Sequence, residues 1–284
     1  MEFCSLKEVY VIMSKRKPNS HKGDNGEVLV VGGSEDYVGA VALAGLAAFR
    51  AGVDWVTIAA PEKVAWAISC LSANLITKKL KGSFFSSKHL KEVLKLSEKH
   101  DVVLIGNGIG LRKETVGFVK GFIKNVKKPL VVDADAIKVM KIKDVNNAIL
   151  TPHAKELEML LKNSGFDRIN RIADKDKKIK EIQKIVGTNV IVMKGMVDVI
   201  ISKNKIKYSK GGNAGMTKAG TGDVLAGLAA GFYAQSKEPF AAACAASYVN
   251  KAIGDVLLKK KKGYSFIASD IVDDLEGFLK RLKK

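Results

Sequence analysis

Continuous apolar runs alternate with helical patterns along most of the chain, and this alternation restricts the fold more than any other feature. The run EVLVVGG at residues 27–33 and the run DVVLIGNGIG at residues 101–110 are apolar through their middle and end in glycines. Strands of this kind, separated by helices, are typical of a parallel sheet covered on both faces. The sequence therefore predicts an α/β fold with a mostly parallel central sheet.

Helices are expected between these runs. The small residues GAVALAGLAAFRAG at residues 39–52 predict a closely packed helix, whose small face could serve the sheet, a subunit contact or the substrate. Residues 113–126 predict an amphipathic helix. A long helix is expected over residues 223–235. The segment at residues 197–212 has the pattern of a hairpin, with Asn204 near its turn.

The C-terminal segment predicts one more helix, with Ser269 as its N-cap. Its apolar residues fall on one face at helical spacing: Ile271, Leu275, Phe278 and Leu279. The composition shows no strong break and no internal repeat, so residues 1–284 are interpreted as a single domain.

Charge and cysteine content narrow the class of protein. The net charge is +19, but the lysines are spread along the chain and aromatic residues make up only 7%. Nucleic-acid grooves usually combine clustered arginine with aromatics, so a solvated basic surface is favoured over nucleic-acid binding. Cys4, Cys70 and Cys244 are far apart in the sequence, which favours reduced thiols and a cytoplasmic protein. No apolar stretch approaches the ~20 residues that a membrane span needs.

Glycine-rich or polar residues follow each expected strand. Ligands of open parallel sheets bind beyond the carboxyl ends of the strands, so these segments are expected to meet along one edge. They are residues 32–34, 106–110, 133–135, 151–153 and 194–195.

Several polar residues have more than one reading. Asp133 and Asp135 have two open roles, which are contact with magnesium through water and capping of the next helix. His89 and His100 are expected at the surface.

The segment KAGTGDVLAG at residues 218–227 places an acid among glycines where a helix begins. Unpaired amides at a helix N-terminus bind anions, and glycines let the main chain approach a phosphate closely. Asp223 would then take a proton from a hydroxyl that attacks phosphorus. The alternative is that Asp223 caps the helix while the glycines form a tight turn. The chain has no Walker A loop.

The segment GTGDVLAG at residues 220–227 resembles the signature of the ribokinase-like superfamily, whose fold is a three-layer α/β/α sandwich. Further segments resemble one branch, the ADP/ATP-dependent NAD(P)H-hydrate dehydratases. In order, they are SHKGDNGEVLVVGGSEDYVGAVALAGLAAFRAGVDWVTIAAPE, GNGIG, VVDADAI, LTPHAKELEML, VIVMKG and GGNAGMTKAGTGDVLAGLAAG. Together they span about residues 20–235.

This resemblance implies repair of NADH or NADPH whose nicotinamide ring has been hydrated. ADP or ATP, with Mg²⁺, would phosphorylate the ring hydroxyl of the S-form, and loss of phosphate would restore the double bond. A kinase for a vitamin or sugar-like alcohol on the same fold is the alternative. The family also implies a homo-oligomer such as a tetramer. An epimerase domain often precedes this domain in the family, but the first ~20 residues here are too few to form one, so an epimerase is expected as a separate protein.

The resemblance also assigns site residues. Asp223 would be the catalytic base and would contact the hydrated substrate, and Asn213 would help to order the site. The amides of Ala219, Gly220, Thr221 and Gly222 would form the anion hole. The nucleotide would bind at Gly222 and at Lys194, Gly195, Met196, Val197 and Asp198. The substrate would bind at Ala40, Gly108 and His153. Lys218 would face either phosphate or solvent.

Overall fold

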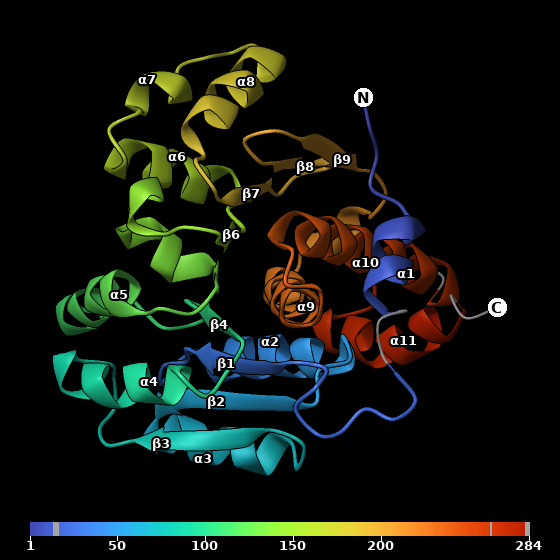
Figure 1. Ribbon diagram of the computed structural model, residues 1–284. Coiled ribbons are helices and arrows are strands. Elements are labelled where there is room, and N and C mark those ends of the chain that lie inside the picture. Colours follow the sequence, from blue (N-terminus) through green and yellow to red (C-terminus); the bar gives the residue numbers. More distant parts are fainter. Residues whose placement is uncertain (14–16, 262, 282–284) are drawn as a thin grey trace.

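The computed structural model describes residues 1–13, 17–261 and 263–281. This part of the chain contains one nine-stranded sheet with the order β3-β2-β1-β4-β5-β6-β7-β8-β9 (Figure 1). The strands are β1 (Glu27–Val31), β2 (Trp55–Pro61), β3 (Ile76–Leu80), β4 (Val102–Ile105), β5 (Leu130–Val132), β6 (Ile149–Leu150), β7 (Val190–Met193), β8 (Asp198–Ile201) and β9 (Ile206–Ser209). Strands β1 to β7 are parallel, and β8 and β9 continue the sheet as an antiparallel hairpin.

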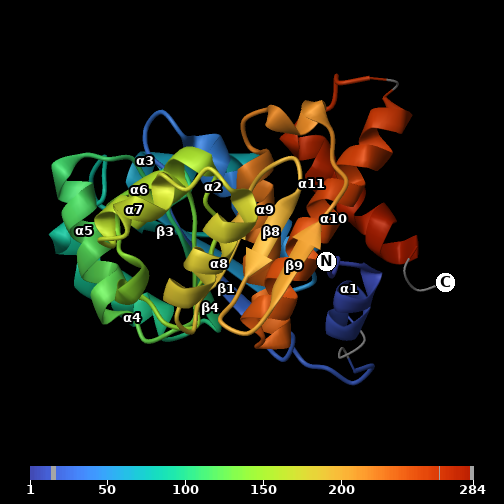
Figure 2. The ribbon, with the colours of Figure 1, turned by 90° about the horizontal axis from the view of Figure 1, so that it is seen from above.

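Helices cover both faces of the sheet, as Figures 1 and 2 show. The core on one face is packed by α1 (Leu6–Met13), α2 (Val38–Arg50), α3 (Glu62–Leu71), α9 (Thr221–Ser236), α10 (Pro239–Lys260) and α11 (Ala268–Arg281). The core on the other face is packed by α4 (Leu90–Ser97), α5 (Lys113–Asn125), α6 (Ala154–Asn163), α7 (Asp167–Asn170) and α8 (Lys175–Ile185). Short 3₁₀ turns join these elements at η1 (Ser87–His89), η2 (Ala134–Val139), η3 (Ile142–Asp144) and η4 (Ala214–Thr217).

Central strands such as β4, and β1 from Val28 onward, are apolar because both of their faces are buried. In β1, Val28 and Val30 belong to one core while Leu29 and Val31 belong to the other. Successive side chains of a strand point to opposite faces, so a strand buried on both sides has no position for a polar residue. The predicted α/β architecture with a mostly parallel sheet is confirmed.

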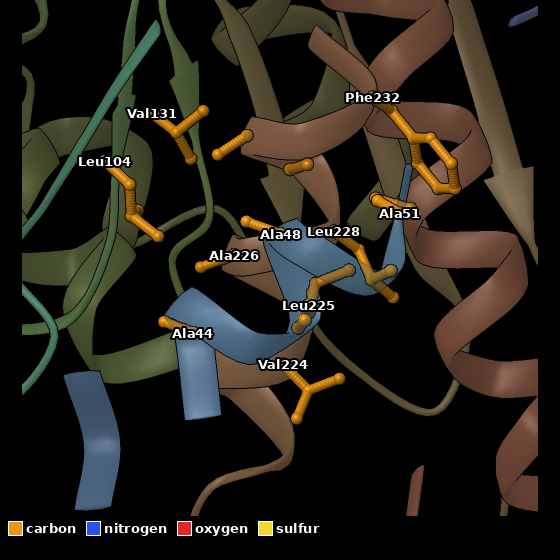
Figure 3. Packing of buried hydrophobic residues seen from close by; sticks show 14 of the residues in the cluster. Ala44, Ala48, Ala51, Leu104, Val131, Val224, Leu225, Ala226, Leu228 and Phe232 are labelled. Atoms are coloured by element: carbon orange, nitrogen blue, oxygen red, sulfur yellow. The ribbon is translucent and has the colours of Figure 1, made fainter. Parts of the chain in front are cut away.

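Small residues let α2 and α9 pack with their backbones close together (Figure 3). A Cβ atom added at Gly227 would lie 2.1 Å from the carbonyl oxygen of Ala44, and one at Gly231 would lie 2.7 Å from that of Ala48. Leu104 and Val131 of the sheet flank this contact. The predicted close packing of the helix at residues 39–52 is confirmed, and its partner is the helix that carries Asp223.

The C-terminal helix begins two residues earlier than predicted. It starts at Ala268, so Ser269 lies inside the first turn and its prediction as the N-cap is wrong. The Asp270 carboxylate instead accepts a hydrogen bond from the Ile267 backbone N–H at 2.8 Å. The predicted apolar face is confirmed, because Ile271, Leu275 and Leu279 are buried.

Two histidines predicted at the surface are buried. His89 is 8% exposed and hydrogen-bonds the Ser86 amide and the Lys81 carbonyl. His100 is 4% exposed and hydrogen-bonds the Leu96 carbonyl and Thr57. Burial lowers the pKa of His100, which keeps its ring neutral. Both predictions are wrong because the partners that satisfy these rings cannot be read from local sequence.

Two of the cysteines that are distant in sequence meet in space. Cys4 and Cys244 are buried, and a hydrogen bond with Cys4, together with burial, raises the pKa of the Cys244 thiol. Cys70 is exposed. No helix in the described ranges combines the length and the apolar character that crossing a bilayer would require.

Candidate functional site

Four neighbouring parallel strands end at one edge of the sheet, and each is followed by a polar side chain of the site. Asn107 lies two residues beyond β4, and Asp133, Thr151 and Lys194 directly follow β5, β6 and β7. Asp223 reaches the same place from the first turn of α9. The predicted convergence of strand ends on one edge is therefore confirmed.

Asp133 is the centre of the polar contacts at this edge. It is 2% exposed, and its Oδ1 accepts hydrogen bonds from Thr151 Oγ1 at 2.7 Å and from Lys194 Nζ at 3.0 Å. Its Oδ2 accepts from Asn107 Nδ2 at 2.9 Å. The side chain makes no capping bond to the helix that follows, so the capping alternative is wrong for Asp133. Its two oxygens are instead held by side chains from three other strand ends.

Asp135 is turned toward the GNGIG segment. Its Oδ2 accepts from the Gly110 amide at 3.0 Å, and its Oδ1 pairs with Lys138 at 2.7 Å. This contact holds the loop after β4 against the loop after β5.

Asp223 has an unusual environment for a carboxylate. Its Oδ1 accepts from Asn107 Nδ2 at 2.7 Å. Burial raises the pKa of Asp223 from 3.8 to about 7, while the Asn107 hydrogen bond and Lys194 oppose that rise and Asp133 adds to it. A carboxylate with a pKa near neutrality can accept a proton and release it again, as a general base must. The alternative that Asp223 caps the helix is wrong, because Gly220 occupies the N-cap position.

Lys194 lies between the acids and the start of α9. Its Nζ is 3.0 Å from Asp133 and 3.7 Å from Glu156. Burial disfavours the ammonium form, but Asp133 and Glu156 outweigh burial and raise the pKa of Lys194. A Cβ atom added at Gly222 would lie 3.5 Å from this Nζ. The ammonium group is thus charged and adjacent to the first turn of α9.

The first turn of α9 has the form of an anion site. Gly220 has φ of 94°, a left-handed conformation that favours glycine, and a Cβ atom there would approach Ala268 and Leu43 within 2.8 Å. Thr221 Oγ1 donates to the Met216 carbonyl at 2.7 Å, which fixes the turn before the helix. The amides at this end have no partner within the helix and carry its positive dipole, although the Thr221 amide donates to the Lys218 carbonyl at 3.4 Å.

Two buried charged side chains, those of Asp198 and Lys251, hold the backbone of the segment after β7. Asp198 is 5% exposed, accepts from the Gly195 amide at 2.9 Å and accepts from Ser247 at 2.7 Å. Lys251 donates to the carbonyls of Gly195 at 2.9 Å and Met196 at 3.1 Å. Met196 is 92% exposed at the tip of the turn.

The loop before α9 is tied to α10. Asn213 Oδ1 accepts from the Gly215 amide at 3.0 Å, and its Nδ2 donates to the Gly254 carbonyl at 2.9 Å. Lys218 donates to the carbonyls of Tyr264 and Phe266. The Lys218 side chain is half-buried, and its ammonium group faces the chain before α11, whose carbonyl acceptors the sequence does not reveal.

The three residues assigned to the substrate lie beside two helix starts. Ala40 is in the first turn of α2, and a Cβ atom at Gly108 would lie 3.2 Å from that of Ala40. The structure therefore brings Ala40 and Gly108 together. His153 caps α6, where its Nδ1 accepts from the Glu156 amide at 3.3 Å and its side chain is 49% exposed. A cavity of about 160 Å³ lies at the start of α2, lined by Glu35, Val38, Pro61, Lys63, Val64 and Ser83.

Four further residues belong to this site, although no role was predicted for them from the sequence: Asn107, Thr151, Glu156 and Lys251. Asn107 and Thr151 lie in segments already expected at the edge of the sheet. Lys251 lies on α10 with no distinguishing local pattern. In the described ranges, no three histidine, cysteine, aspartate or glutamate side chains form a group that could hold a metal ion.

Comparison with known proteins identifies the family. The sequence profile described as NAD(P)H-hydrate dehydratase matches residues 28–276. The chain belongs to the NAD(P)H-hydrate dehydratase family. The resemblance seen in the sequence is confirmed.

Curated relatives of this dehydratase-family chain are longer proteins. It is 40% identical over 271 residues to the bifunctional NAD(P)H-hydrate repair enzyme Nnr of Methanocaldococcus jannaschii, covering 94% of this chain and 51% of that protein. It is 39% identical over 266 residues to the enzyme of the same name from Methanothermobacter thermautotrophicus, covering 91% of this chain and 50% of that protein. The chain thus spans about half the length of these relatives.

Solved structures of a NAD(P)H-hydrate dehydratase and of a ribokinase share the fold of this chain. The ADP/ATP-dependent NAD(P)H-hydrate dehydratase of Bacillus subtilis, co-crystallized with ATP/Mg²⁺, has a TM-score of 0.79 at 23% identity, covering 99% of this chain and 98% of that chain. Ribokinase from Thermotoga maritima has a TM-score of 0.57 at 15% identity, covering 90% of this chain and 99% of that chain. The predicted ribokinase-like fold is confirmed.

Proposed function

We propose that this chain dehydrates the S-form of hydrated NADH or NADPH in a reaction that consumes ADP or ATP. The observation that carries the proposal is Asp223, a carboxylate whose pKa is raised to about 7 beside a helix N-terminus and a buried ammonium group. Family membership and the curated relatives support the choice of substrate.

The first step is transfer of the terminal phosphoryl group to the ring hydroxyl. Asp223 accepts the hydroxyl proton while that oxygen attacks the terminal phosphorus, and the bond from phosphorus to the nucleotide oxygen breaks. The amides of residues 219–222 and Lys194 bind the oxygens of the transferring group. The segment 194–198 binds the nucleotide, and Gly222 lies near it.

The second step is loss of phosphate. The carbon–oxygen bond of the phosphorylated ring breaks, the neighbouring ring carbon loses a proton, and the double bond of the nicotinamide is restored. Phosphorylation is needed because phosphate leaves far more readily than hydroxide. Ala40, Gly108 and His153 bind the hydrated dinucleotide, and Asn213 keeps the loop before α9 in place.

Magnesium would arrive with the nucleotide rather than occupy a site built by the protein. The described side chains offer no group of three acidic, histidine or cysteine ligands. Mg²⁺ is commonly bound by substrate phosphates with one or two carboxylates and water. When bound, it would neutralise phosphate charge, and the residues named above supply the remaining contacts.

Turnover of purified hydrated NADH tests the proposal. With Mg²⁺ and either ADP or ATP, the absorbance of the reduced nicotinamide should recover together with release of phosphate. A stable phosphorylated product from another alcohol would instead favour the alternative of a small-molecule kinase. No turnover with either nucleotide by folded protein would contradict the proposal.

We also propose a cytoplasmic homo-oligomer such as a tetramer, without a nucleic-acid partner. Light scattering of the purified protein tests the assembly. A monomer at micromolar concentration would contradict it.

A further inference from the structure

Asn107 joins two carboxylates that would otherwise face each other without a bridge. Its Nδ2 donates to Asp223 Oδ1 at 2.7 Å and to Asp133 Oδ2 at 2.9 Å. The side chain is fully buried. Asp223 is 116 residues further along the chain, so the contact exists only in the folded protein.

The two acceptors fix the orientation of the amide. An amide nitrogen has two N–H donors, whereas its oxygen would face both carboxylates with lone pairs. Asn107 Oδ1 consequently points elsewhere, and it has no hydrogen-bond partner among the described residues. A buried acceptor without a partner is unfavourable, so the two bonds to Asp223 and Asp133 decide how this side chain lies.

The backbone around Asn107 holds the amide in place. The Asn107 carbonyl accepts from the Gly33 amide at 2.9 Å, and a Cβ atom at Gly32 would lie 2.4 Å from that carbonyl. At Gly106, φ is 125° and a Cβ atom would lie 1.9 Å from the Asp133 carbonyl. These close approaches leave Asn107 little freedom to move away from either acid.

We propose that Asn107 is a positioning residue for the phosphoryl-transfer step, holding one oxygen of Asp223 so that the other faces the substrate hydroxyl. Asp223 Oδ2 accepts no hydrogen bond from the described residues, so it is available for that proton. This inference rests on the proposed role of Asp223 as the base. Asp133, held by Lys194 and Thr151, is the fixed anchor at the other end of the bridge.

Replacement of Asn107 by leucine removes both donors at similar size. Asn107→Leu should lower kcat by about tenfold or more with little change in KM for the hydrated coenzyme, because orientation rather than binding is lost. The acidic limb of its pH–rate profile should move to higher pH, because the lost hydrogen bond favoured the ionised form of Asp223. Asn107→Ala serves the same purpose if leucine prevents folding, which circular dichroism checks.

Thr151→Val is the matched control. Thr151 is also fully buried and donates to Asp133 at 2.7 Å, but no hydrogen bond joins it to Asp223. Its acidic limb should stay at the wild-type position. A limb that shifts equally in Thr151→Val and Asn107→Leu would overturn the proposal, as would an unshifted limb and unchanged kcat in folded Asn107→Leu.

Carbon-13 NMR titration of aspartate carboxyl groups separates this inference from the proposed function. The carboxyl signal that is absent in Asp223→Asn belongs to Asp223, and its titration can be followed without substrate. A higher pKa of this signal in Asn107→Leu supports the bridge even if the wild type fails to turn over hydrated NADH. An identical pKa in both proteins overturns it.

Discussion

The ammonium group of Lys194 lies 3.0 Å from Asp133 Oδ1 and 3.7 Å from Glu156 Oε2, so one buried cation serves two buried acids. Asp133 is 2% exposed and Glu156 is 4% exposed. The same cation is adjacent to Gly222 at the start of α9. Under the proposed function, Lys194 therefore has two roles, which are to stabilise this edge of the sheet and to bind phosphate.

Replacing Lys194 should harm both stability and activity. Lys194→Met leaves Asp133 and Glu156 without their buried partner, and this should lower the free energy of unfolding by about 3 kcal/mol. Adding Asp133→Asn should restore part of that loss without restoring turnover. Urea unfolding of the single and double variants measures the effect, and a double variant less stable than Lys194→Met would contradict the pairing.

Asp223→Asn should stabilise the protein at neutral and alkaline pH. The folded-state pKa of Asp223, about 7, lies above its value in the unfolded chain, so folding is penalised when the group must ionise. The penalty begins above about pH 4, grows through pH 7 and is complete beyond it.

At alkaline pH, the free energy of unfolding of the variant should thus exceed that of the wild type by roughly 1–3 kcal/mol, a range that allows for partial solvent contact of Asp223. Near pH 4 the two free energies should be almost equal. Thermal unfolding at several pH values measures this difference. A gain that does not depend on pH would contradict the raised pKa.

Lys251 should affect nucleotide binding without taking part in the phosphoryl-transfer step. Its Nζ donates to the carbonyls of Gly195 and Met196 and pairs with Asp198 at 3.3 Å. Lys251→Met should raise the Kd for ADP by about tenfold, because the turn after β7 loses its support. Lys237→Met, at the opposite end of α9, is the control and should leave the Kd unchanged. Calorimetric titration distinguishes the two, and equal Kd values would count against the role of Lys251.

Two glycine substitutions should have opposite effects on stability. In Gly227→Ala the new methyl would lie 2.1 Å from the Ala44 carbonyl oxygen, so α2 and α9 must move apart at a cost of about 2 kcal/mol or more. Gly117 lies in α5, is exposed and has no atom within 4 Å of a Cβ position. Gly117→Ala should stabilise by about 0.5–1 kcal/mol. A Tm for Gly227→Ala equal to that of the wild type would contradict the close packing.

The sequence predicts much of the fold because local patterns determine its elements. Continuous apolar strands such as β4 indicate burial on both faces, and the segment around Asn204 indicates the hairpin of β8 and β9. The predicted meeting of strand ends at one edge follows from parallel topology alone. Asp223 could be found from the glycines around it.

The contacts between side chains could not be predicted in the same way. Asn107 reaches Asp223 across 116 residues, and Lys251 reaches Gly195 across 56. His100 can be buried because its ring forms a hydrogen bond with Thr57, which is 43 residues away in the sequence. Such partners depend on which helices and strands become neighbours in the fold. Local sequence patterns do not show which side chains then come within hydrogen-bond distance.

The pH dependence of hydrated NADH turnover in the wild type and Asp223→Asn tests the central claim most directly. If Asp223 is the base, kcat/KM of the wild type should rise with pH to a plateau above about 7, since the ionised carboxylate accepts the proton. Asp223→Asn should lose turnover at every pH while still binding nucleotide. A variant that retains wild-type turnover, or a wild-type profile without an acidic limb, would contradict the account.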